Sequence, residues 1–82
     1  MTAPDWLAAH DGGLVKGFDD RWLVTIGGGP QYRLEVLPAK GQFSCAIVQT
    51  NNGKRLDEGR VYPTAEAALA GGLDELCARL GW

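Results

Sequence analysis

The sequence contains few of the residues that build metal and redox sites. It has one histidine, His10, and two cysteines, Cys45 and Cys77, with no CxxC pair. These three residues are too few for a closed zinc site of four nitrogen or sulfur ligands, and we expect no metal and no cofactor. Each cysteine lies in an apolar pattern, which favours a reduced core residue. A disulfide between them would require a strand and a helix to bring their Cα atoms within about 7 Å.

A long apolar run and a strong excess of one charge are also lacking. No apolar run approaches the ~18 residues of a membrane span, and the start of the chain has neither the basic nor the apolar part of a signal peptide. The formal net charge is −2, whereas nucleic-acid-binding domains usually carry a clear basic excess. We therefore expect a soluble, cytoplasmic protein with no membrane contact, for which nucleic acid is a disfavoured partner.

No set of catalytic residues is evident. His10 is followed by Asp11, but no known motif places a nucleophile beside them. Residues 27–30, Gly-Gly-Gly-Pro, lack the Lys-Ser/Thr of a phosphate loop and lead into a strand rather than a helix. Asp19 and Asp20 match no calcium-loop spacing and indicate a solvated turn. We therefore expect that the protein is not an enzyme.

The hydrophobic pattern predicts a helix, four strands and a second helix. A short helix is expected at 4–10, and strands at 22–26, 32–37, 43–50 and, less regularly, 54–62. Thr64 and Gly81 are typical of the two ends of a final helix. Short connections favour antiparallel pairing. Residues 1–82 are thus predicted to form a single α+β domain, with an antiparallel three- or four-stranded sheet, a C-terminal helix packed across one face and a short N-terminal helix.

The final helix carries a leucine stripe that must face the sheet. Gly71 and Gly72 interrupt this helix, and we expect them to allow close approach of its backbone to a strand or to another chain. The predicted core combines this stripe with one side of each regular strand: Trp22, Val24, Tyr32, Leu34, Val36, Phe43, Cys45, Ile47, Leu69, Leu73, Leu76 and Leu80.

The other side of the sheet is the candidate interaction face. It would carry Leu23, Leu37 and Val48 beside Arg21 and Arg33. Aliphatic residues on a polar face favour a cover, which the N-terminal helix or a second protein could supply. The leading hypothesis is a non-catalytic protein-interaction or self-association module, such as a homodimer. The alternative is a weak nucleic-acid-binding domain, since residues 21–62 hold six basic and three acidic side chains; its contacts would be Arg21, Arg33, Arg55 and Arg60.

The second half of the sequence resembles a known family. The pattern consists of Gly-x-Phe from Gly41, then Asn52-Gly53-Lys54, Gly59, Tyr62, Thr64, Ala67-Ala68 and Gly72. It resembles the small YegP-type family of uncharacterised bacterial proteins. The resemblance implies a bacterial protein with two strands joined by an Asn-Gly turn and followed by a helix, and it implies no activity. The strands followed by a Tyr-Pro-Thr helix start are also similar to the arm-type DNA-binding domains of phage integrases.

Overall fold

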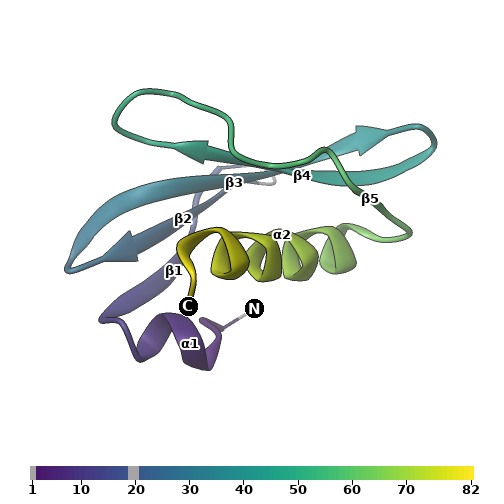
Figure 1. Ribbon diagram of the computed structural model, residues 1–82. Coiled ribbons are helices and arrows are strands. Elements are labelled where there is room, and N and C mark those ends of the chain that lie inside the picture. Colours follow the sequence, from purple (N-terminus) through teal and green to yellow (C-terminus); the bar gives the residue numbers. More distant parts are fainter. Residues whose placement is uncertain (1, 19–20) are drawn as a thin grey trace.

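The computed structural model describes residues 2–18 and 21–82 (Figure 1). The elements in chain order are α1 (Asp5–Ala8), β1 (Gly12–Lys16), β2 (Arg21–Ile26), β3 (Gly29–Ala39), β4 (Gln42–Gln49), β5 (Val61–Tyr62) and α2 (Ala65–Leu80). The strands form one antiparallel sheet in the order β1-β2-β3-β4-β5. Both helices lie on the same side of this sheet (Figure 1). The predicted α+β class and the packing of the C-terminal helix are therefore confirmed, and the sheet has five strands.

The additional strand is β1, which begins with Gly12 and Gly13, shortly after the first helix. Gly12 opposes Ile26 and Gly13 opposes Thr25 in the β1–β2 ladder. A Cβ at residue 12 would overlap the fully buried side chain of Leu7, and a Cβ at residue 13 would lie 2.9 Å from Thr25 Oγ1. The glycines thus let α1 fold back closely against the strand that follows it.

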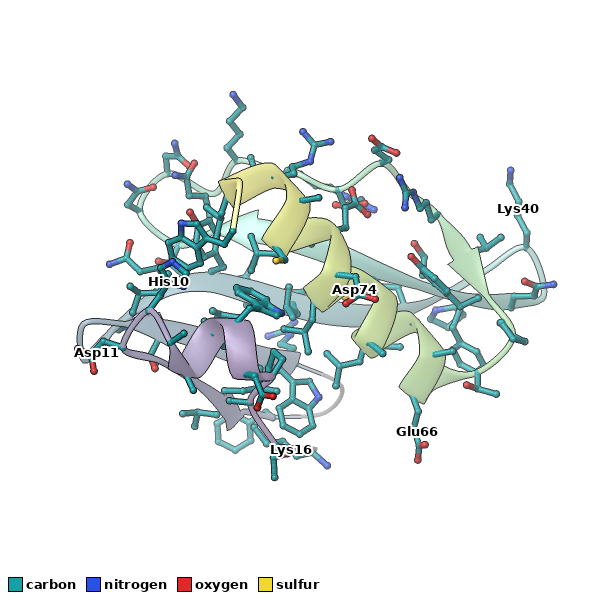
Figure 2. All side chains as sticks on the ribbon, turned by 60° about the horizontal axis from the view of Figure 1, so that its bottom comes forward. His10, Asp11, Lys16, Lys40, Glu66 and Asp74 are labelled. Atoms are coloured by element: carbon teal, nitrogen blue, oxygen red, sulfur yellow. The ribbon has the colours of Figure 1, made fainter. Side chains whose placement is uncertain are left out.

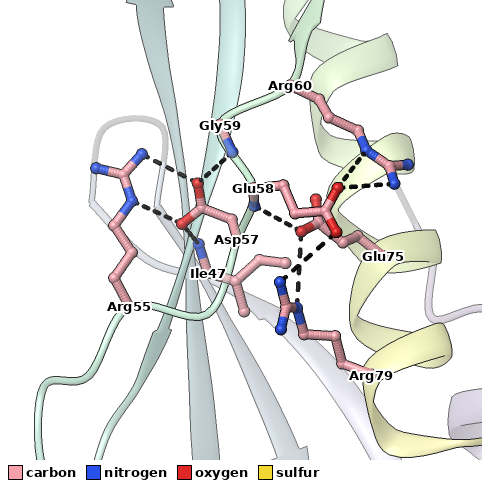
Figure 3. A network of polar contacts seen from close by, with 8 residues as sticks. All are labelled: Ile47, Arg55, Asp57, Glu58, Gly59, Arg60, Glu75 and Arg79. Carbon is pink, nitrogen blue, oxygen red and sulfur yellow. Dashed lines mark hydrogen bonds and ion pairs between the residues drawn. The ribbon is translucent and has the colours of Figure 1, made fainter.

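The strand expected at 54–62 is mostly irregular. Only Val61–Tyr62 forms β5, and Arg55 makes an isolated bridge to Val48. Between them the backbone follows β4, with the Leu56 N–H donating to the Ile47 carbonyl at 2.7 Å. We call residues 55–60 the strap, because this segment crosses from β4 towards α2 (Figure 3).

The core lies between the sheet and the two helices. All twelve predicted core residues belong to it: eight are buried, and Trp22, Tyr32, Phe43 and Leu80 pack against them half-buried. Leu7 of α1 and Ala68 of α2 complete the buried set. The predicted close approach at the α2 glycines is confirmed, since a Cβ at Gly71 would overlap the Tyr62 ring and one at Gly72 would overlap Cys45 Sγ.

Both ends of α2 are closed by local interactions. Thr64 Oγ1 accepts the Ala67 N–H at 3.0 Å, and Gly81 adopts a positive φ of 73°. Trp82 then stacks on His10 with a ring separation of 3.9 Å and tilts against Trp6 at 6.0 Å. The C-terminal residue therefore contacts the α1 region on the helix side of the sheet.

Candidate interaction surface

The side of the sheet opposite the helices carries two apolar rows. We call this side the outer face; the strand register assigns to it Val15, Arg21, Leu23, Thr25, Arg33, Glu35, Leu37, Ser44, Ala46, Val48 and Val61. In the first row Val15 opposes Leu23, Leu23 opposes Arg33, and Arg33 opposes Val48. Val15 is 52% exposed, whereas Leu23 and Val48 are half-buried.

The second apolar row crosses β3, β4 and β5. Leu37 opposes Ser44, and Ser44 opposes Val61. Leu37 is 39% exposed and Val61 is 41% exposed, while Ser44 between them is buried and its Oγ has no hydrogen-bond partner in the described part of the chain. Val15 and Val61 are not among the predicted face residues, because neither lies in a segment with clear strand alternation.

A charged row separates the two apolar rows. Arg21 opposes Glu35, which opposes Ala46 on β4. The Glu35 carboxylate lies 2.6 Å from Arg33 Nε and 3.6 Å from Arg21 Nε. One carboxylate therefore pairs with both arginines. The structure thus brings together all five residues of the predicted interaction face.

The four arginines of the nucleic-acid alternative do not share one surface. Arg55 bridges to Val48 at the end of the first apolar row, so that Val48 lies between it and Arg33. Arg60 instead lines a hollow beside α2 with Asp74, Glu75, Ala78 and Arg79. Arg55 pairs with Asp57 at 2.6 Å and Arg60 pairs with Glu58 at 3.0 Å. Each of the four predicted phosphate contacts thus already has a carboxylate neighbour.

Asp57 attaches the strap to the sheet (Figure 3). Its side chain is 1% exposed, and its carboxylate accepts the Ile47 N–H at 3.1 Å, the Gly59 N–H at 3.1 Å and two hydrogen bonds from Arg55. Burial acts to raise the pKa of Asp57, but the hydrogen bonds and the charge of Arg55 outweigh it and lower the pKa below its ordinary value. The carboxylate is therefore held in its charged form.

Glu75 attaches the strap to α2. This buried carboxylate accepts the Glu58 N–H at 2.7 Å and lies 3.8 Å from Arg79 Nε (Figure 3). Asp57 and Glu75 together hold the strap between β4 and α2. This arrangement was not predicted, because the sequence pattern along residues 54–62 does not reveal side chains that form hydrogen bonds with backbone groups distant in sequence.

The residues considered for chemistry are the two cysteines and His10. Both cysteines are free thiols, as the apolar pattern predicted. Burial, with smaller contributions from nearby Asp57 and Glu75, raises the pKa of Cys45 to about 12, so its thiol stays protonated and unreactive at neutral pH. His10 Nδ1 lies 2.8 Å from the Trp6 carbonyl oxygen while the ring stacks on Trp82.

No metal-binding group of three or more His, Cys, Asp or Glu side chains occurs within residues 2–18 and 21–82. The turn predicted at Asp19 and Asp20 lies outside the described residues. Among the described helices, none combines the length and apolar character needed to cross a bilayer.

Comparisons with known proteins identified no relative. No protein-family model, no curated protein and no solved structure matches the chain. The resemblance to the YegP-type family therefore stays a prediction.

Proposed function

We propose that this protein is a non-catalytic interaction module whose outer face binds a second copy of the chain. The observation that carries the proposal is the set of five aliphatic side chains on a sheet face that no described helix covers: Val15, Leu23, Leu37, Val48 and Val61. The short N-terminal helix packs on the opposite side, so it does not supply the cover that the sequence analysis considered. Several aliphatic side chains gathered on one exposed face are typical of a protein-binding site.

The charges of the outer face favour a protein partner over nucleic acid. Arg21 and Arg33 share the carboxylate of Glu35, and Arg55 is paired in a bidentate manner with Asp57. A phosphate would have to compete with these carboxylates and would be repelled by them. A protein surface gains from the apolar rows and leaves the existing ion pairs intact. The two free cysteines further support a reducing compartment, the bacterial cytoplasm.

The test is the oligomeric state of two lysine variants. Leu37→Lys places a charge in the second apolar row, and Ala70→Lys places the same charge on an exposed position of α2, away from the sheet. We expect sedimentation equilibrium to show that the wild-type chain and Ala70→Lys associate equally. We expect the dissociation constant of Leu37→Lys to be at least about tenfold higher, which corresponds to about 1.4 kcal/mol of binding free energy. Equal association of all three proteins would contradict the proposal.

The nucleic-acid alternative gives a different result in a second experiment. Mixed DNA and RNA oligonucleotides are added to labelled protein in low salt, and amide NMR shifts are recorded. Shifts in residues 21–62 that disappear as salt is raised would favour phosphate binding and overturn the proposed function, because phosphate contacts weaken steeply with salt. We expect no such shifts.

A further inference from the structure

The free edge of β1 is a second open feature of the sheet. At its two ends the Gly17 N–H donates to the Arg21 carbonyl and the Gly27 N–H donates to the Asp11 carbonyl, both within the β1–β2 register. In an antiparallel pair, hydrogen-bonded and non-hydrogen-bonded residue pairs alternate. Gly13 and Val15 therefore bond to β2, whereas Gly12, Leu14 and Lys16 direct their N–H and C=O groups away from it.

The two edges of the sheet differ in their capacity to accept a strand. β5 has two residues, and the strap occupies much of the remaining edge of β4 through the Leu56–Ile47 hydrogen bond. β1 has five residues, and within residues 2–18 and 21–82 no backbone group pairs with its outward side. An unpaired edge of this length is a template for another strand.

We propose that β1 pairs antiparallel with β1 of a second copy about a two-fold axis at Leu14. With the axis at Leu14, all five residues of β1 have a partner. Leu14 opposes the partner subunit's Leu14, Gly12 opposes the partner subunit's Lys16, and Gly13 opposes the partner subunit's Val15. The outward groups of Gly12, Leu14 and Lys16 then form the new ladder. The result is one continuous ten-stranded sheet, twice the five strands of a single chain.

The residues of β1 are complementary in size in this register, because Gly12 and Gly13 each oppose a longer residue of the partner subunit. Asp11 and Lys16 lie at opposite ends of the strand and are both exposed (Figure 2). Antiparallel pairing places Lys16 opposite the partner subunit's Gly12 and Asp11 opposite the partner subunit's Gly17, and the two-fold axis repeats both pairs. Phe18 is 88% exposed. In this register it lies near the connection between α1 and β1 of the partner subunit, where His10 and Trp82 stack.

The β1 interface is separate from the outer face and is compatible with it. Edge pairing lies in the plane of the sheet, whereas outer-face binding stacks one sheet on another. Two different two-fold contacts whose axes cross at right angles close into a tetramer. The inference therefore goes beyond the proposed function and stands without it, and the masses of selected variants distinguish the two.

The test uses N-methyl-Leu14, introduced by chemical synthesis of the chain. The Leu14 N–H points away from β2, so methylation removes no internal hydrogen bond, but it blocks both central bonds of the proposed ladder. The control is the unmodified chain made by the same synthesis. We expect sedimentation equilibrium to give N-methyl-Leu14 half the mass of the control. Lys16→Pro, which also removes an outward N–H, is expected to weaken association in the same direction.

The variant masses separate the possible failures. If both interfaces exist, the control is a tetramer, and Leu37→Lys and N-methyl-Leu14 are each dimers. If only the outer face binds, N-methylation leaves the mass unchanged, which overturns the β1 inference alone. If only β1 pairs, Leu37→Lys leaves the mass unchanged and N-methyl-Leu14 is a monomer, which overturns the outer-face proposal alone.

Hydrogen exchange in the unmodified chain provides a measurement that does not depend on folding of a variant. We expect the Leu14 and Lys16 amides to be protected at concentrations where the chain associates and to exchange rapidly where it dissociates. Rapid exchange of both amides in the associated protein would overturn β1 pairing.

Discussion

At the scale of single residues, carboxylates in different surroundings have different structural roles. Glu35 lies on the outer face and balances two arginines, whereas Asp57 and Glu75 accept backbone N–H groups that are distant in sequence. An ionised carboxylate that accepts several hydrogen bonds is more costly to lose than an exposed ion pair, because its donors are then left unsatisfied. The acidic residues therefore fix the local structure more than the arginines do.

The lowered pKa of Asp57 predicts a loss of stability in acid. Its folded-state pKa lies below the unfolded value of about 3.9, so its stabilising contribution is complete above that pH and is lost as the pH falls through the folded-state pKa. As the pH is lowered below about 4, we expect the free energy of unfolding of Asp57→Asn to decrease less steeply than that of the wild-type chain. Urea unfolding over a pH series measures this, with Asp74→Asn at an exposed position of α2 as control. Identical slopes for Asp57→Asn and the wild-type chain would contradict it.

Gly72 is predicted to resist replacement by alanine. In a helix interior alanine is favoured over glycine by about 1 kcal/mol, but forcing a methyl group into a packed core costs about 1–3 kcal/mol. The new Cβ would overlap Cys45 Sγ and lie 2.9 Å from Cys45 Cβ. We expect Gly72→Ala to lower the free energy of unfolding by up to about 2 kcal/mol, measured in urea.

A double-mutant cycle with Cys45→Ala tests the cause of this loss. Removing the sulfur should recover part of the cost, so the two substitutions together should destabilise less than the sum of their separate effects. A stabilising Gly72→Ala, or strict additivity, would show that the contact with Cys45 is not responsible.

At the scale of elements, the strap depends on side chains rather than on a strand ladder. Its backbone makes few regular sheet hydrogen bonds. Instead, the Asp57 carboxylate accepts N–H groups of β4 and of the strap, and the Glu75 carboxylate of α2 accepts the Glu58 N–H. Removing either carboxylate should therefore release the strap locally while the rest of the sheet keeps its pairing.

Glu75→Ala tests this separation. Loss of the acceptor removes the hydrogen-bond partner of the part-buried Glu58 N–H, which costs about 1–3 kcal/mol. We expect faster hydrogen exchange at Glu58 with little change at Leu34 in β3. Asp74→Ala, an adjacent exposed change in α2, is the control and should leave Glu58 unaffected. Equal acceleration throughout the chain would indicate global unfolding instead.

The regular elements could be predicted because their patterns are local. The alternation along β3 and β4, the leucine spacing of α2 and the cap at Thr64 each follow from neighbouring residues. β1 could not be predicted in this way, since its first two residues, Gly12 and Gly13, are small because they fit against Leu7 and Thr25, which lie elsewhere in the chain. The candidate interaction face was predictable from the alternation of β2, β3 and β4, but its ion pairs and the position of Arg60 depend on the tertiary structure.

At the scale of the whole molecule, the described residues cover the sheet with helices on one side only. Both helices and the C-terminal Trp82 lie on the helix side, and the outer face keeps two apolar rows with a balanced charged row between them. The same sheet has one free edge at β1. A small domain that buries a modest fraction of its surface gains stability when a second copy covers such features.

The mass of the unmodified chain in solution, measured by sedimentation equilibrium from low to millimolar concentration, tests the central claim most directly. Self-association predicts a mass that rises with concentration to a multiple of 8.8 kDa and that persists when salt is raised, because apolar contacts and backbone pairing are only weakly screened. A mass of 8.8 kDa at every concentration would contradict the account.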